Sequence, residues 1–241
     1  MTSADWIKDL PVAHRGYHDM NRTVWENTLS AFSRAVEAGF AIECDLQLTA
    51  DSIPVVFHDH DLERLCGIKG DVRERTSAEL AMLTVGGTAD KIPTLKQMLK
   101  LVAGKVPLVI EIKGRAGEDD GFVEAVLEDL EGYQGKVALM SFDHHILKDL
   151  KSANCPYPVG LTAEGVKPED FFRHDEAMQL GLDFISYSWA HLPNSFVTGR
   201  RQSHVPVITW TVRDENARAH TYTQADQMTF EGFDPRETAA V

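Results

Sequence analysis

Cysteine and long apolar runs are both scarce in this chain, and each shortage excludes a class of protein. The 241 residues contain three cysteines, Cys44, Cys66 and Cys155, whose number and spacing fit neither a disulfide framework nor a zinc site. No apolar run reaches the roughly 18 residues of a membrane span. The first residues show no basic region followed by an apolar stretch. We therefore expect no secretory signal, no membrane anchor and a reduced, cytoplasmic protein.

Positive charge is also in short supply. The chain has 24 Lys and Arg residues against 37 Asp and Glu residues, which gives a formal net charge of -13. A nucleic-acid binder normally carries a basic patch, and anionic membrane surfaces attract basic segments, so we expect neither partner. A small anionic substrate is compatible with this charge if the site supplies its own cations. A homo-oligomer is also compatible with the sequence, which leaves the oligomeric state open.

Short apolar runs rich in Val and Ile alternate with helical patterns along the chain. With 43% hydrophobic and 25% charged residues, the composition is typical of a globular protein with a substantial core. The predicted strands are residues 12–14, 41–48 with 54–58, 107–112, 136–141, 158–161, 183–187, 205–211 and 225–230. The predicted helices are residues 27–38, 118–130, 143–152, 168–180 and 214–219.

This alternation of strand and helix predicts a parallel sheet. About eight strand–helix units in one chain favour a (β/α)8 TIM barrel. A doubly wound open sheet is the alternative, but no Gly-rich nucleotide fingerprint follows any predicted strand. Residues 59–92 break the alternation, and we interpret them as a small insertion after the second strand. We expect residues 1–241 to form a single domain.

Charged residues interrupt two of the predicted strands at every second position. Glu43 and Asp45 lie on one strand, and Glu111 and Lys113 lie on another. Residues two apart share one face of a strand, and two carboxylates about 4 Å apart repel by roughly 4 kcal/mol. The oxygen donors of Glu43, Asp45 and Glu111 suit one divalent cation, Mg²⁺ or Ca²⁺, better than zinc. The alternative is that these acids pair with Arg15 and Lys113 and bind no metal.

Barrel enzymes have their active sites at the carboxyl ends of their strands. This rule predicts that further side chains lie at the same end of the barrel. Arg15 and Lys113 can clamp a phosphate, although either can also form a structural ion pair. His14 and His58 can serve as acid and base, because imidazole titrates near pH 6.5. Trp210 can line the substrate's carbon skeleton, and core packing is an equally good interpretation.

The other histidines are interpreted as ordinary residues. His60 needs a separate comment, because the residues from His58 to Asp61 resemble a metal-binding loop. It lies beyond the predicted strand, so we leave it out of the site. His18 falls in a predicted loop, and we assign it no role.

In these residues the chain resembles the glycerophosphodiester phosphodiesterase family. The shared motifs occur in the family's order over about 200 residues, so chance is a poor explanation. They are His14-Arg15-Gly16, Glu26-Asn27 with the residues to Phe32, Ala38-Gly39-Phe40, Glu43-x-Asp45, Thr49-Ala50-Asp51, Pro54-Val55-Val56-x-His58-Asp59, Leu62-x-Arg64, Ile92-Pro93-Thr94-Leu95, Glu111-Ile112-Lys113, Ser141-Phe142 and Trp210-Thr211.

The resemblance implies a fold, an activity and a role for each matching residue. The fold is a (β/α)8 barrel with an insertion after the second strand. The activity is metal-dependent hydrolysis of a small-molecule glycerophosphodiester to sn-glycerol 3-phosphate and an alcohol. The implied roles are metal binding for Glu43, Asp45 and Glu111, acid–base catalysis for His14 and His58, phosphate binding for Arg15 and Lys113, and support of the metal and the first loop for Glu26 and Asn27.

Two segments depart from the family pattern. Asp51-Ser52 stands where the family usually has Asp-Gly, and residues 225–233 differ from the usual Gly-Val-Asp and Thr-Asp-x-Pro motifs of the last strand. The resemblance therefore predicts the substrate range less closely than it predicts the reaction type. The alternatives are a family member acting on a lysophospholipid or sugar phosphodiester, a non-catalytic phosphodiester-binding barrel, and an enolase-type enzyme that abstracts a proton.

Overall fold

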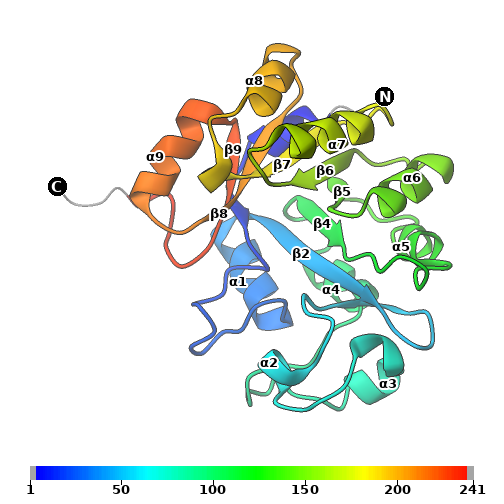
Figure 1. Cartoon of the computed structure of the whole chain (residues 1–241). Coiled ribbons are helices and arrows are strands. Elements are labelled where there is room, and N and C mark those ends of the chain that lie inside the picture. Colours follow the sequence, from blue (N-terminus) through cyan, green and yellow to red (C-terminus); the bar gives the residue numbers. More distant parts are fainter. Residues whose placement is uncertain (1–3, 238–241) are drawn as a thin grey trace.

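The computed structural model describes residues 4–237 and contains a closed barrel of parallel strands with helices around it (Figure 1). The sheet has nine strands in the order β1-β9-β8-β7-β6-β5-β4-β2-β3, and β1 also pairs with β2, which closes the ring. Each pair in the ring is parallel, whereas β3 is antiparallel to β2. The predicted (β/α)8 barrel is therefore confirmed.

The elements follow the predicted alternation. The strands are β1 (Val12–Ala13), β2 (Ala41–Leu48), β3 (Pro54–Val56), β4 (Leu108–Ile112), β5 (Val137–Ser141), β6 (Val159–Ala163), β7 (Phe184–Ser188), β8 (Val207–Val212) and β9 (Gln227–Phe230). The α-helices are α1 (Leu29–Ala38), α2 (Glu63–Cys66), α3 (Ser77–Leu80), α4 (Leu95–Val102), α5 (Phe122–Asp129), α6 (His144–Ser152), α7 (Pro168–Met178), α8 (Ser195–Gln202) and α9 (Glu215–Gln224). Three 3-10 helices are η1 (Asp5–Lys8), η2 (Val72–Glu74) and η3 (Trp189–His191).

Strand β2 shows how a simple alternation of residues places charge inside the barrel. Every residue of β2 is buried. Ile42, Cys44 and Leu46 belong to the main apolar core that also includes the inner faces of the helices. Because successive side chains of a strand point to opposite faces, Glu43 and Asp45 point into the barrel.

Apolar side chains close the floor of the barrel below these charges. Val12, Ala41, Val109, Ala138, Phe184 and Ile208 form a second buried cluster with Ile7 of η1. Gly160 on β6 leaves room for the ring of Phe184, because a Cβ at this position would lie 2.3 Å from Cζ of that ring. Apolar side chains therefore occupy the barrel at the amino ends of these strands, below the charged residues.

The predicted insertion contains α2, η2 and α3 and lies beyond the end of β2 (Figure 1). Its apolar side chains form a third cluster with β3, which includes Leu65 of α2, Val72 of η2 and Leu80 of α3. Helix α4 then returns the chain to the barrel. None of the helices within residues 4–237 has the length and apolar character needed to cross a bilayer.

Outside the insertion, two α-helices of the described residues were not predicted from the sequence, α4 and α8. Helix α4 begins with a capping box in which Thr94 accepts from the Gln97 backbone N–H and Gln97 reaches back to Thr94. In α8, Gly199 lowers helix propensity, and the cap at Asn194 helps to fix its start. Both omissions concern the outer layer and leave the barrel unchanged.

Candidate active site

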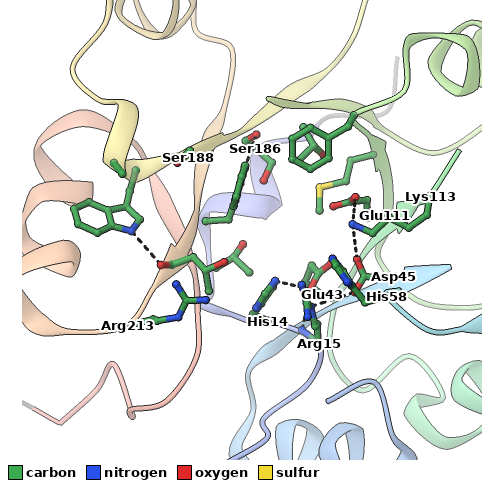
Figure 2. Close-up of a pocket in the computed structure, with 18 residues that line it drawn as sticks. His14, Arg15, Glu43, Asp45, His58, Glu111, Lys113, Ser186, Ser188 and Arg213 are labelled. Atoms are coloured by element: carbon green, nitrogen blue, oxygen red, sulfur yellow. Dashed lines mark hydrogen bonds and ion pairs between the residues drawn. The ribbon is translucent and has the colours of Figure 1, made fainter. Parts of the chain in front are cut away.

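A cavity of about 400 Å³ opens at the carboxyl ends of the barrel strands (Figure 2). Charged side chains, among them Arg15, Glu43, Asp45 and Lys113, gather on one side of it, while Ser186 and Ser188 lie across from them. All the residues predicted to form the site line this cavity, namely His14, Arg15, Glu43, Asp45, His58, Glu111, Lys113 and Trp210.

The three predicted metal-binding carboxylates meet because β2 and β4 are neighbours in register. Asp45 lies directly opposite Glu111 across this parallel pair. One oxygen from each of Glu43, Asp45 and Glu111 lies within 4.8 Å of the others. The side chains are almost fully buried, with at most 5% of any of these residues exposed. Residues far apart in the chain therefore form one compact acidic cluster.

Two cations contact this acidic cluster. Nζ of Lys113 lies 3.0 Å from Oδ1 of Asp45 and also contacts Glu111. Nε of Arg15 lies 3.4 Å from Oδ2 of Asp45, and the Arg15 backbone N–H donates to Oε2 of Glu43 at 2.8 Å. The ion pairs considered as the alternative to a metal are thus present. Three acids nevertheless face two cationic side chains.

The pKa values of the three acids indicate that Arg15 and Lys113 do not offset all of the repulsion between the carboxylates. Burial raises the pKa of Glu43 well above its usual range, and the nearby carboxylates of Asp45 and Glu111 raise it further. Burial also raises the pKa of Glu111 to about 7, although Lys113 opposes the shift. For Asp45, burial is outweighed by Lys113, His58 and Arg15, so its pKa falls below the ordinary range. The set of hard oxygen donors with unrelieved repulsion fits a divalent cation.

The two histidines reach the cavity from different elements. His14 directly follows β1, and its Nε2 lies 4.0 Å from Oε2 of Glu43. His58 follows β3, and its Nδ1 bonds Oδ1 of Asp59 at 2.6 Å. Burial lowers the pKa of both imidazoles, so the neutral form is favoured at each site.

The predicted strand 54–58 requires one correction. Strand β3 ends at Val56, so His58 is not part of it. Strand β2 extends past the rim of the barrel, and the antiparallel β3 brings the chain back, with the Phe57 N–H donating to the Asp45 carbonyl at 3.0 Å. His58 therefore reaches the mouth on a returning hairpin, which the rule of parallel strand ends does not describe.

A model of the glycerophosphoryl diester phosphodiesterase family matches residues 14–232 of the chain. The chain belongs to this family. A glycerophosphodiester phosphodiesterase from Caldanaerobacter subterraneus is 32% identical to it over 218 residues, which cover 86% of each chain. These similarities show that the chain is an enzyme of the phosphoric diester hydrolase class.

Solved structures of phosphodiesterases share the fold. The glycerophosphodiester phosphodiesterase of Thermotoga maritima superposes with a TM-score of 0.74 and 27% identity, covering 92% of this chain and 94% of that one. An Oleispira antarctica phosphodiesterase, solved in complex with the product sn-glycerol 3-phosphate, superposes with a TM-score of 0.83 and 23% identity over 94% of each chain.

The phosphodiesterase holds Arg15 in place through a network of hydrogen bonds. Oε1 of Glu26 accepts from Nη1 of Arg15 at 2.6 Å and from Nη2 of Arg64 at 2.8 Å. Nη2 of Arg64 also donates to Oδ1 of Asp59 at 2.8 Å. The amide of Asn27 donates to Oδ2 of Asp45 at 2.9 Å. Glu26 therefore contacts the predicted phosphate-binding arginine, and Asn27 contacts a predicted metal-binding residue.

Trp210 both lines the phosphodiesterase cavity and packs against its surroundings. Its ring meets Phe142 edge to face with 5.4 Å between centroids, and its Nε1 donates to the Ser186 carbonyl at 3.2 Å. Both interpretations of Trp210 from the sequence are therefore compatible with its position. Together with Phe142 and Met140, it makes this side of the cavity apolar.

Sequence reasoning assigned no role to Glu231, which contacts His14, or to Arg213, which contacts Glu231 and lines the cavity. Glu231 directly follows β9, at the same edge of the barrel as the other site residues. The rule that selects residues at strand ends would have identified it. The segment was instead considered only as a departure from the family pattern.

Proposed function

We propose that this enzyme hydrolyses glycerophosphodiesters to sn-glycerol 3-phosphate and an alcohol, in a metal-dependent reaction with His14 and His58 as the acid–base pair. The observation that carries this proposal is the meeting of both histidines with three buried carboxylates at one cavity. The proposal treats residues 1–241 as one phosphodiesterase domain with an insertion at about residues 59–92.

Glu43, Asp45 and Glu111 are the residues that would hold the cation, Mg²⁺ or Ca²⁺. When bound, a divalent ion neutralises the non-bridging oxygens of a phosphodiester and the charge that develops there. Arg15 and Lys113 line the same part of the cavity and bind the phosphate oxygens alongside. Burial and the acidic neighbours act in opposite directions on Lys113, and the net result raises its pKa, so it keeps its positive charge.

Proton transfer falls to the two imidazoles. His14 takes a proton from the nucleophile, and His58 protonates the departing alkoxide. The carboxylates of Asp45 and Asp59 favour the protonated form of His58, against burial, which disfavours it. The nucleophile is either the glycerol 2-hydroxyl, giving a cyclic phosphate that water then opens, or water itself. In the two-step route the histidines exchange roles.

The apolar wall formed by Phe142 and Trp210 is the surface against which the carbon skeleton of the substrate packs. The relative from Oleispira antarctica binds sn-glycerol 3-phosphate as its product, which supports a substrate of this size. A cavity of about 400 Å³ is large enough for a small phosphodiester.

The proposal is tested by assaying a panel of glycerophosphodiesters with choline, ethanolamine, inositol or glycerol as the leaving alcohol, in a titration with Mg²⁺ and with Ca²⁺. We expect sn-glycerol 3-phosphate as the product and no turnover after chelation. Turnover of lysophospholipids alone would move the enzyme to the alternative substrate class. Tight binding of all substrates without turnover would indicate a binding barrel instead.

A further inference from the structure

The ring of His14 has a carboxylate beside each of its nitrogens. Its Nδ1 is hydrogen-bonded to Oε2 of Glu231, while its Nε2 lies near Glu43, a member of the acidic cluster. In Figure 2, His14 lies between Arg213 and Glu43. An ionised carboxylate only accepts, so Nδ1 carries the proton when the ring is neutral and the Nε2 lone pair faces the acidic cluster.

Glu231 is itself held from several directions. Its Oε1 accepts from Nε of Arg213 at 2.7 Å, and its Oε2 lies 3.5 Å from Nε2 of His18. The Nδ1 of His18 accepts from the Met20 backbone N–H at 3.2 Å, which leaves the His18 proton on the nitrogen that faces Glu231. The Glu231 backbone N–H donates to the Val212 carbonyl at 3.0 Å. Both the side chain and the backbone of Glu231 are therefore fixed.

These contacts keep Glu231 charged although it is only 7% exposed. Burial by itself would raise its pKa, but the hydrogen bonds from His14 and His18 and the charge of Arg213 outweigh burial and hold the pKa below the ordinary range. A buried, fixed and ionised carboxylate is a lasting acceptor for the Nδ1 proton of His14 and so fixes the orientation of the ring.

The same three side chains can also be considered as a metal site. Ligand-type atoms of His14, His18 and Glu231 lie within 4.8 Å of one another. However, Nδ1 of His14 donates its proton to Oε2 of Glu231, and Nε2 of His18 carries a proton and lies 3.5 Å from the same oxygen, so neither nitrogen presents a lone pair to a common centre. We therefore do not interpret this cluster as a metal site.

The other histidine of the site is supported in a similar way. His58 bonds Asp59 through Nδ1, and Oδ2 of Asp59 accepts from Nε of Arg64 at 2.6 Å. Each histidine thus has a carboxylate on Nδ1 and an arginine behind that carboxylate. The two arrangements come from unrelated segments, one after β3 and one after β9.

We propose that Glu231 is a positioning residue for His14: it binds Nδ1 and so orients the ring with Nε2 toward the acidic cluster. The inference rests on the proposed function, in which His14 transfers a proton. Arg213 and His18 act one step further away by fixing Glu231.

A double-mutant cycle with Glu231→Gln and His14→Ala tests this role. We expect Glu231→Gln to lower kcat by at least about 10-fold, with little change in KM, and His14→Ala to lower it by about 10²–10⁴-fold. Because Glu231 acts through His14, the double variant should be no slower than His14→Ala alone. Glu231→Asp, which keeps the charge, should recover part of the loss.

The matched control is Glu215→Gln on α9, which removes a glutamate paired with Arg218 at the surface and should keep the wild-type kcat. Wild-type kcat in Glu231→Gln would overturn the proposal. A loss that multiplies with that of His14→Ala would also overturn it, because a merely structural defect lowers activity in both backgrounds.

A second measurement needs neither turnover nor a folded Glu231 variant. In wild-type protein with ¹⁵N-labelled histidine, the Nδ1 proton of His14 should be observed, protected from exchange, and should vanish in His14→Ala. A neutral His14 with its proton on Nε2 would contradict the proposal. If the wild-type enzyme fails to turn over glycerophosphodiesters with either cation, the proposed function fails, while this spectrum still decides whether Glu231 orients His14.

Discussion

At the scale of residues, the site joins groups whose charges would be costly on their own. Three buried carboxylates share a cavity with Arg15 and Lys113, and burial keeps both histidines near their neutral forms. Neutral imidazole is the form that can accept a proton, whereas a ring that acts as an acid must be protonated, a form that adjacent carboxylates stabilise. The balance between burial and adjacent charge therefore determines the role that each ring can play.

His58 should be essential for turnover but not for cation binding. We expect His58→Ala to lower kcat by about 10²–10⁴-fold, because the leaving alkoxide loses its proton donor. Calorimetric titration with Mg²⁺ and Ca²⁺ should give affinities close to wild type, because Glu43, Asp45 and Glu111 are unchanged. His60→Ala is the matched control and should keep its activity, since His60 lies outside the residues that line the cavity. Normal turnover by His58→Ala would remove His58 from the mechanism.

Glu26 should make stability depend on pH. Burial disfavours its charge, but Arg64 and Arg15 prevail and lower its pKa from 4.5 to about 2. A folded-state pKa below the unfolded value adds stability above about pH 4.5, and this stability is lost as pH falls toward 2. Glu26→Gln should therefore reduce the free energy of unfolding by on the order of 3 kcal/mol at pH 7, and by progressively less in acid.

Urea unfolding of wild type and Glu26→Gln at a series of pH values measures this difference. The exposed Glu63→Gln serves as the control and should change stability little at any pH. A difference that stays constant between pH 7 and pH 3 would show that the Glu26 charge is not the source of the effect.

At the scale of elements, the periodicity of the sequence predicts which residues lie inside a strand better than it predicts where the strand ends. Glu43 and Asp45 could be placed inside a strand because alternation is visible in the sequence itself. The end of β3 could not, because the return of the chain depends on its pairing with β2. The position of Glu231 at a strand end could have been predicted, whereas its contact with His14, 217 positions away, depends on closure of the barrel.

The floor of the barrel gives a prediction at this scale. Gly160→Ala on β6 should lower the free energy of unfolding by about 1–3 kcal/mol, because the added methyl group overlaps the ring of Phe184 on β7. Replacing Phe184 with Leu in the same chain should recover part of that loss. Chemical denaturation of the single and double variants measures the coupling, and strictly additive effects would contradict the proposed overlap.

At the scale of the whole molecule, the proposed binding of a cation by the acidic cluster would be coupled to folding. The folded chain brings Glu43, Asp45 and Glu111 together, and the unfolded chain does not. A cation at 100 times its dissociation constant should therefore add about 2.7 kcal/mol to stability. We expect chelation to lower both Tm and activity, and added Mg²⁺ or Ca²⁺ to restore them.

Glu111→Gln provides the matched variant for this experiment. It removes one ligand charge and should reduce the shift in Tm on addition of Mg²⁺ or Ca²⁺. An equal shift in wild type and Glu111→Gln would place cation binding elsewhere in the molecule.

The closure of the barrel by its first and last strands has a consequence for synthesis. Strand β1 pairs with β9, and the residues that follow these strands, His14 and Glu231, contact each other. As a nascent chain leaves the ribosome, every residue that lines the catalytic cavity emerges before Glu231 does. The enzyme therefore completes its active site only after β9 and Glu231 have been made, and a product that terminates before β9 would leave β1 without its partner strand.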